Sequence, residues 1–255
     1  MTVTGSAPTA LQEAVEICTA AAEAQVTVRL AGGLAIQYLT PEFPPRGGDR
    51  QDLDLAIQAS DRKPLTRFLA GRGYDGDKNF NALYGHKQLY FRSTRTNRSL
   101  DILVDRLHMC HTVEFKERLG RMPVTLDVSD LLLTKLQIVE LNEKDAQDVL
   151  YLLSAYPVRD GDEPGTIGLG RILPIVSNDW GWWRTVTMNL DRVINLASGD
   201  GRALVPGSGK HAAVDQLSGL GQAIEAAPKS LRWKARAKVG ERVRWYETPE
   251  ESPRH

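Results

Sequence analysis

The chain has few cysteines, no long apolar run and no excess of charge of either sign. Only two cysteines, Cys18 and Cys110, occur among 255 residues, too few for a disulfide framework, so we expect reduced thiols. No segment approaches the roughly 20 apolar residues that span a bilayer. Residues 1–9 also lack a basic stretch followed by an apolar core. We therefore expect a cytoplasmic protein with no membrane partner.

Charge is balanced over the whole chain but not along it. Lysine and arginine together number 32, as do aspartate and glutamate, so total charge neither favours nor excludes a nucleic-acid partner. Residues 229–245 are locally basic, with Glu241 as the single acidic residue and Trp233 and Trp245 interleaved. Such a segment can bind an RNA backbone through phosphate contacts. The alternative is a solvated helix face whose tryptophans pack inward.

Apolar spacing predicts an α/β arrangement in residues 1–126. Glycines 32 and 33 separate a short strand from the next helix, and a Pro/Gly-rich loop at 41–48 precedes an apolar strand. The expected helices are 9–25, 34–39 and 62–71, and the expected strands are 26–30, 52–57, 87–92, 100–104 and 122–126.

Residues 127–255 have the composition of a helical portion. We expect a helical stretch at 131–153 that breaks near Asn142, a linker at 157–170, and further helices at 180–197, 211–226 and 229–244. The predicted fold class is α+β, with a small mixed β-sheet domain flanked by helices in 1–126, followed by a helical C-terminal portion in 127–255.

Asp52 and Asp54 stand two residues apart in an apolar run. Because successive side chains of a strand alternate between faces, both carboxylates are expected on one face. Asp101, in a second apolar run, completes a three-carboxylate cluster if the two strands are neighbours. Divalent cations would relieve the mutual repulsion of such a cluster. Asp105 has the same strand parity, but the apolar neighbours of Asp101 favour Asp101 as the third ligand.

The order of these features resembles the nucleotidyltransferase superfamily that includes DNA polymerase β. In that family a strand and a glycine pair open a helix, an Asp-x-Asp strand follows, and a third carboxylate lies on another strand. The resemblance implies that Gly32 and Gly33 lie beside a nucleoside triphosphate (NTP), where their backbone can approach phosphate oxygens. It also implies that Asp52, Asp54 and Asp101 are catalytic and hold two Mg²⁺ ions, and that residues 1–126 form a nucleotidyltransferase core.

A second block resembles the AbiEii-type and MenT-type nucleotidyltransferases, many of which are toxins of toxin–antitoxin pairs. It comprises Ser129-Asp130 followed by Lys135, and then Lys144-Asp145 followed by Asp148. The resemblance implies that Lys135, Lys144, Asp145 and Asp148 contribute to the nucleotide pocket, and that a cognate antitoxin is a partner. The alternatives are a snorkelling lysine on an amphipathic helix for Lys135 and a solvated helical turn for the others.

The expected reaction transfers a nucleoside monophosphate from an NTP to an acceptor hydroxyl. The resemblance suggests an RNA or tRNA 3′ end as acceptor, with a protein side chain or a small molecule as alternatives. Asp52 and Asp54 would serve both metal ions, Asp101 would help to deprotonate the attacking hydroxyl, and Lys135 would neutralise triphosphate charge. The rival hypothesis is a non-catalytic nucleotide- or protein-binding module on the same fold.

Two further groups of residues suggest functions that we do not favour. His108, Cys110 and His111 invite a zinc site, but no second ligand pair stands at a suitable spacing, so a loop or core role is predicted. Trp180, with the two tryptophans at 182 and 183, is predicted to pack between helices rather than to stack on bases.

Overall fold

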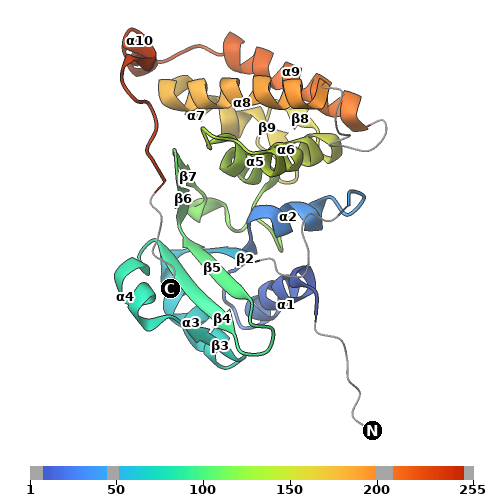
Figure 1. Cartoon of the computed structure of the whole chain (residues 1–255), viewed down its shortest axis with the longest axis vertical. Helices are drawn as coiled ribbons and strands as arrows, with labels where there is room; N and C mark the ends of the chain where they lie inside the picture. Colours follow the sequence, from blue (N-terminus) through green and yellow to red (C-terminus); the bar gives the residue numbers. More distant parts are fainter. Residues whose placement is uncertain (1–7, 45–51, 199–208, 250–255) are drawn as a thin grey trace. The chain divides into compact units, whose positions relative to one another are not determined.

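A computed structural model describes residues 8–44, 52–198 and 209–249 of the chain, which fall into two units. The N-terminal unit comprises the described residues up to Leu107 together with Glu114–Leu126. The C-terminal unit comprises His108–Val113 and the described residues from Asp127 onward. Helices and a small mixed sheet together make an α+β fold, as the sequence predicts (Figure 1).

The N-terminal unit is built on a five-stranded sheet with the order β1-β2-β5-β4-β3. β2 and β5 pair in parallel, whereas the other neighbouring strands pair antiparallel. The strand bounds are β1 (Arg29–Leu30), β2 (Leu53–Ile57), β3 (Tyr74–Gly76), β4 (Gln88–Ser93) and β5 (Ser99–Val104).

Four helices accompany this sheet, and their first residues explain where they begin. α1 starts after Thr9, whose side chain forms a capping box with Gln12. α2 starts at Gly32 itself, so the glycine pair opens the helix rather than separating it from the strand. The helix bounds are α1 (Ala10–Glu23), α2 (Gly32–Leu39), α3 (Arg62–Ala70) and α4 (Lys78–Tyr84). Two short strands, β6 (Arg106–His108) and β7 (Thr112–Glu114), form a separate sheet.

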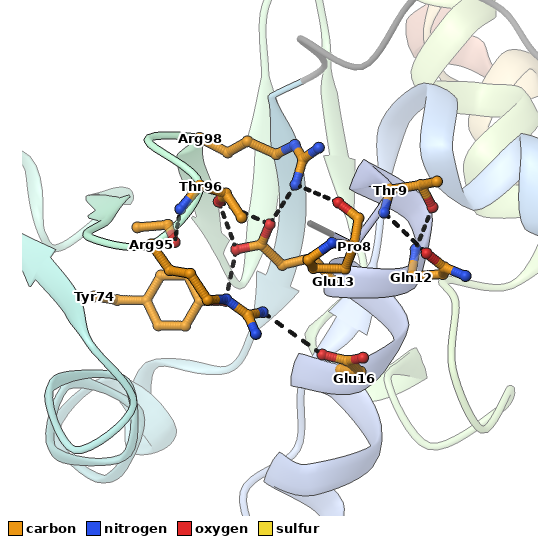
Figure 2. A network of polar contacts seen from close by, with 10 residues as sticks. Pro8, Thr9, Gln12, Glu13, Glu16, Tyr74, Arg95, Thr96 and Arg98 are labelled. Carbon is orange, nitrogen blue, oxygen red and sulfur yellow. Dashed lines mark hydrogen bonds and ion pairs between the residues drawn. The ribbon is translucent and has the colours of Figure 1, made fainter. Parts of the chain in front are cut away.

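A buried polar network ties α1 to the sheet (Figure 2). Glu13 of α1 is 1% exposed and accepts hydrogen bonds from Tyr74 Oη at 2.8 Å, Thr96 Oγ1 at 2.9 Å and Arg98 Nη1 at 2.7 Å. Burial raises the pKa of the Glu13 carboxyl, but these hydrogen bonds and the charge of Arg98 outweigh burial and lower it. The carboxylate therefore holds α1 against β3 and the β4–β5 hairpin.

The predicted edge strand at 122–126 is wrong. Only an isolated bridge joins Thr125 to Leu30, with Leu30 donating to the Val124 carbonyl and Leu126 donating to the Leu30 carbonyl. β1 is two residues long, and Pro123 has no N–H to extend the pairing. The Pro/Gly-rich loop predicted at 41–48 lies within the described residues only as far as residue 44.

The C-terminal unit is mainly helical. The predicted break near Asn142 is confirmed, because the Asn142 side chain accepts a hydrogen bond from Asp145 N and caps a new helix. The helix bounds are α5 (Val128–Leu136), α6 (Glu143–Ala155), α7 (Leu169–Asn178), α8 (Trp180–Ser198), α9 (Gly209–Ala226) and α10 (Leu231–Ala237).

The sequence predicts a linker at residues 157–170, but this prediction is wrong. These residues are an internal part of the C-terminal unit. Strands β8 (Val158–Arg159) and β9 (Ile167–Gly168) pair in parallel. A Cβ on Gly168 would lie 2.6 Å from the Gly161 carbonyl oxygen, so only glycine permits this close approach. The composition of the segment therefore reflects tight backbone packing.

The helix predicted at 229–244 is too long. α10 ends at Ala237, and Gly240, with φ of +58°, opens a single 3₁₀ turn. Trp233 packs edge-on against Trp183 at 5.1 Å between ring centroids, which matches the alternative of tryptophans that pack inward. No helix within the described ranges is long and apolar enough to cross a bilayer.

Candidate active site

The register of β2 and β5 places two of the predicted carboxylates side by side. Asp54 and Asp101 are direct partners in this parallel pair, so their side chains leave the same face of the sheet. Asp54 is half-buried, whereas Asp101 is 5% exposed. Asp52 precedes β2 and is exposed. The structure thus brings Asp54 and Asp101, which are 47 residues apart in sequence, to neighbouring positions.

The first residue of α2 lies directly against one of these carboxylates. Gly32 has φ of +60°, and a Cβ added to it would lie 2.1 Å from Asp54 Oδ2. The preceding residue, Ala31, donates its N–H to the Asp54 carbonyl at 2.8 Å, which fixes the start of α2 on β2. Gly33 follows as the second residue of α2. No side chain but hydrogen fits at Gly32, because both the backbone angle and the space exclude a Cβ.

Two polar side chains that the sequence analysis did not single out support the carboxylates. Gln88 Nε2 donates to Asp101 Oδ1 at 2.6 Å, and Ser99 Oγ donates to Asp52 Oδ1. Ser99 shares a strand face with Asp101, two residues away, so strand parity could have identified it. Gln88 reaches Asp101 only through the pairing of β4 with β5, which places Gln88 opposite Leu103.

The predicted ligand set of Asp52, Asp54 and Asp101 for two Mg²⁺ ions stays a prediction. Among the residues that the structure describes, no group of three or more His, Cys, Asp or Glu side chains is arranged as a metal site. Asp54 and Asp101 nevertheless fit a divalent cation, because adjacent carboxylates are the hard oxygen ligands that Mg²⁺ prefers. The backbone of Gly32 packs directly against the Asp54 carboxylate, so this side of the carboxylate is closed to any side chain at position 32.

Asp105, the competitor of Asp101, has a structural role. It follows β5 with φ of +64°, and its Oδ1 accepts a hydrogen bond from Ala59 N at 2.9 Å. This contact joins the end of β5 to the turn after β2. The preference for Asp101 as the residue beside Asp54 is therefore consistent with the register of the sheet.

The second predicted group forms a buried ion cluster in the C-terminal unit. Lys135 Nζ of α5 lies 2.8 Å from Asp145 Oδ1 and 3.0 Å from Asp148 Oδ2 of α6. Asn142 Nδ2 donates to the other Asp145 oxygen at 2.8 Å. Lys144 differs from the other three predicted residues, because it lies exposed on the first turn of α6. The contribution of all four to a nucleotide pocket stays a prediction.

A further buried pair involves the acidic residue at the start of the same motif. Asp130 is fully buried, and its Oδ1 accepts from Arg171 Nε of α7 at 2.8 Å. Ser129 Oγ donates to the Thr166 carbonyl at 3.0 Å and accepts from Gly168 N at 2.9 Å. The Ser129-Asp130 dipeptide therefore connects α5 to β9 and α7.

The residues that suggested zinc lie in the C-terminal unit and have other partners. The His111 ring stacks on Trp182 at 4.9 Å between centroids, and its Nε2 lies 2.8 Å from Thr185 Oγ1. Burial lowers the pKa of His111 to about 4. Cys110 and Cys18 are buried and form no disulfide, and burial raises the pKa of the Cys18 thiol to about 12. These features agree with a core role and with reduced thiols.

Comparisons with known proteins identify no family for the chain. No protein-family model and no curated protein matches the chain. One similar solved structure is an antigenic nucleotidyltransferase-like protein from Paracoccidioides brasiliensis, with 13% identity over 87% of this chain and 94% of that one and a TM-score of 0.40. Another is a STING-associated CdnE c-di-GMP synthase from Capnocytophaga granulosa, with 14% identity over 86% and 80% of the two chains and a TM-score of 0.28.

Proposed function

We propose that the chain is a divalent-metal-dependent nucleotidyltransferase whose reaction centre is the carboxylate pair of the N-terminal unit. The observation that supports this most directly is the pairing of Asp54 with Asp101 against the Cβ-free backbone of Gly32. A carboxylate pair beside a helix N-terminus offers oxygen ligands for cations and backbone N–H groups for phosphate at adjacent positions.

In this reaction the oxygen of an acceptor hydroxyl attacks the α-phosphorus of an NTP. A new P–O bond forms, the bond to the β-phosphate bridging oxygen breaks, and pyrophosphate leaves. Bound Mg²⁺ would supply charge stabilisation for the entering and leaving oxygens. Asp101, oriented by Gln88, accepts the hydroxyl proton directly or through water. Asp52, Asp54 and Asp101 would hold the metal, and Gly32 and Gly33 would let the backbone approach the triphosphate.

The test is incubation of the purified protein with each α-labelled NTP, Mg²⁺ and either total RNA or total protein. We expect the wild type to label one acceptor class and Asp54→Asn to label it at least about 100-fold more slowly, because a metal ligand is lost. Asp75→Asn is the matched control, since Asp75 is an exposed aspartate on β3 of the same sheet. Chelation of Mg²⁺ by EDTA should abolish labelling, and added Mg²⁺ should restore it.

Two outcomes would contradict this function. Equal labelling by wild type and Asp54→Asn would remove the carboxylate pair from the chemistry. Nucleotide binding without labelling of RNA, protein or a small-molecule acceptor would favour the rival, a non-catalytic binding module.

We further propose that the acceptor is an RNA 3′ end, including that of tRNA. We also propose that the protein acts as a toxin with a cognate antitoxin. The support is the resemblance of the Lys135 and Lys144-Asp145 segments to toxin nucleotidyltransferases. Induced expression should then arrest growth, and Asp54→Asn should relieve the arrest. Toxicity that survives this substitution would separate any harm from catalysis.

A further inference from the structure

The C-terminal unit contains a cavity of about 720 Å³ that lies outside the residues of the proposed reaction. It is lined by the turn between β6 and β7, the residues where α8 begins, and the segment that contains α10 and the chain up to Glu247. Its volume falls within the range of about 300–1,000 Å³ that is usual for small-molecule sites. All the lining residues belong to this one unit.

Indole rings form much of the wall. Trp180 and Trp182 are each 6% exposed, and Trp245 donates from Nε1 to Thr185 Oγ1 at 3.0 Å. Trp245 packs edge-on against Trp180 with 6.0 Å between ring centroids, and edge-on against Tyr246 with 5.3 Å between ring centroids. Trp182 stacks on His111 and Trp180 lies under the Arg236 guanidinium, so these two rings form the floor of the cavity. The half-buried ring of Trp245 is the one on which a planar ligand could stack, and its hydrogen bond limits the loss of side-chain entropy.

Three arginines line the same cavity: Arg232, Arg236 and Arg244. Arg236 holds the segment together, because its guanidinium donates to the Gly240 and Val243 carbonyls at 2.7 Å each. Arg232 is exposed, with its nearest carboxylate oxygen, on Asp179, at 4.0 Å. Arg244 is also exposed, and its Nη1 donates to Thr248 Oγ1 at 3.0 Å. The other N–H groups of Arg232 and Arg244 can bind a phosphate.

The two carboxylates of the cavity wall already have hydrogen-bond partners. Asp179 Oδ1 accepts from Gly181 N at 2.8 Å and Trp182 N at 3.1 Å, at the positive end of α8. Glu247 Oε2 lies 2.9 Å from His108 Nε2. Three guanidinium groups against two hydrogen-bonded carboxylates leave an excess of positive charge, so the cavity is expected to favour an anion.

We propose that this cavity is a binding site for a nucleoside monophosphate unit, with the base stacked on Trp245 and the phosphate held by Arg232 and Arg244. The unit belongs either to a free nucleotide or to the end of a single strand, which share this chemistry. The site is separate from the proposed nucleotidyl transfer and does not depend on it, because no residue of the carboxylate pair lines the cavity.

The test is titration of the full chain with adenosine 5′-monophosphate, followed by tryptophan fluorescence and calorimetry. All five tryptophans, Trp180, Trp182, Trp183, Trp233 and Trp245, belong to the C-terminal unit, so quenching reports on this unit. We expect adenosine and ribose 5-phosphate each to bind at least about tenfold more weakly than the intact nucleotide, because each lacks one of the two contacts. A 5′-phosphorylated oligoadenylate that binds more tightly than the monophosphate identifies a strand end, and weaker binding identifies a free nucleotide.

Arg232→Ala and the double variant Arg232→Ala/Arg244→Ala should weaken binding by about 10- to 100-fold. Arg242→Ala is the matched control, because Arg242 is exposed on the same segment but does not line the cavity. Absence of binding by the wild type, or equal affinity of the Arg232 and Arg242 variants, would overturn the proposal. Loss of binding in Asp54→Asn would also overturn it, because the nucleotide would then bind at the carboxylate pair, whereas loss of transfer alone would leave it intact.

Discussion

At the scale of single residues, the backbone of Gly32 decides whether Asp54 can keep its position. An alanine there would place a methyl group 2.1 Å from Asp54 Oδ2 on a backbone with φ of +60°. The resemblance noted in the sequence implies that Gly32 and Gly33 are glycines because their backbone approaches a triphosphate. The structure adds a reason that holds without any ligand, namely the close approach of the carboxylate.

Gly32→Ala is therefore expected to destabilise the N-terminal unit by about 1–2 kcal/mol through the positive φ alone. Displacement of Asp54 should also reduce nucleotidyl transfer by about 100-fold. Gly120→Ala is the control, because its Cβ would meet nothing within 4 Å. Urea unfolding followed by circular dichroism, together with the labelling assay, measures both effects. Equal behaviour of the two alanine variants would contradict the prediction.

The lowered pKa of Glu13 makes the free energy of unfolding of the N-terminal unit depend on pH. The carboxyl has a pKa below its ordinary value in the folded state, so its contribution is present above the unfolded-state pKa and is lost as pH falls through the folded-state pKa. Glu13→Gln is expected to cost about 2 kcal/mol at pH 7 and to flatten the loss of stability below about pH 4.5.

The control for Glu13 is Glu16→Gln, because Glu16 forms only an exposed ion pair with Arg95 at 3.9 Å. This variant should change the free energy of unfolding by less than about 0.5 kcal/mol. Hydrogen exchange of the β4 and β5 amides as a function of pH measures both variants. An unchanged pH dependence in Glu13→Gln would refute the assigned role of the carboxylate.

At the scale of elements, local patterns predicted helices better than the contacts between strands. The break before α6 follows from the capping preference of Asn142, which acts within one turn. The strand predicted at 122–126 failed because pairing depends on a distant partner, and the two-residue β1 offers little length for it. The linker predicted at 157–170 is wrong because composition alone does not reveal close backbone packing.

The ion cluster of Lys135, Asp145 and Asp148 allows the stability contribution of a buried lysine to be compared with that of the exposed Lys144. Lys135→Met would leave Asp145 and Asp148 buried without their cation, and we expect a loss of about 3–5 kcal/mol. Lys144→Met, on the exposed first turn of α6, should remain within about 0.5 kcal/mol of the wild type. Urea unfolding monitored by tryptophan fluorescence compares the two. Equal losses would show that the ion cluster does not stabilise the helix pair.

At the scale of the whole molecule, one short segment of the chain belongs to a different unit from the residues on either side of it. Residues 108–113 belong to the C-terminal unit, although they lie within the sequence of the N-terminal one. Cys110 accepts a hydrogen bond at its carbonyl from Glu247 N at 3.1 Å, and His111 N donates to Gln137 Oε1 at 3.1 Å. The C-terminal unit therefore includes a segment that is separated from the rest of it in sequence by Glu114–Leu126 of the N-terminal unit.

This segment should also give the C-terminal unit a dependence on pH. Burial lowers the pKa of His111 to about 4 from an unfolded value of 6.5, so the unfolded state binds the proton first as pH falls. The stability of the unit should be complete above about pH 6.5 and should decrease by on the order of 3 kcal/mol toward pH 4. Neighbouring Asp179 and Glu247 oppose this shift and His108 adds to it.

His111→Gln removes the titrating group and should flatten this pH dependence, whereas His108→Gln, at an exposed ring, should leave most of it. The measurement is the urea midpoint by tryptophan fluorescence between pH 4 and pH 7. A wild-type midpoint that stays constant over this range would contradict the assignment to His111.

The sequence by itself determined the α+β class, the candidate residues and most of the helices, because helical periodicity, capping and strand alternation are local properties of the chain. It did not predict α4 or α7, and it made the last helix too long. Only the tertiary structure decided that Asp54 stands opposite Asp101, that Gln88 supports it, and that residues 108–113 complete the C-terminal unit. Register and long-range packing arise from the burial of apolar surfaces that are distant in sequence. No local pattern carries that information.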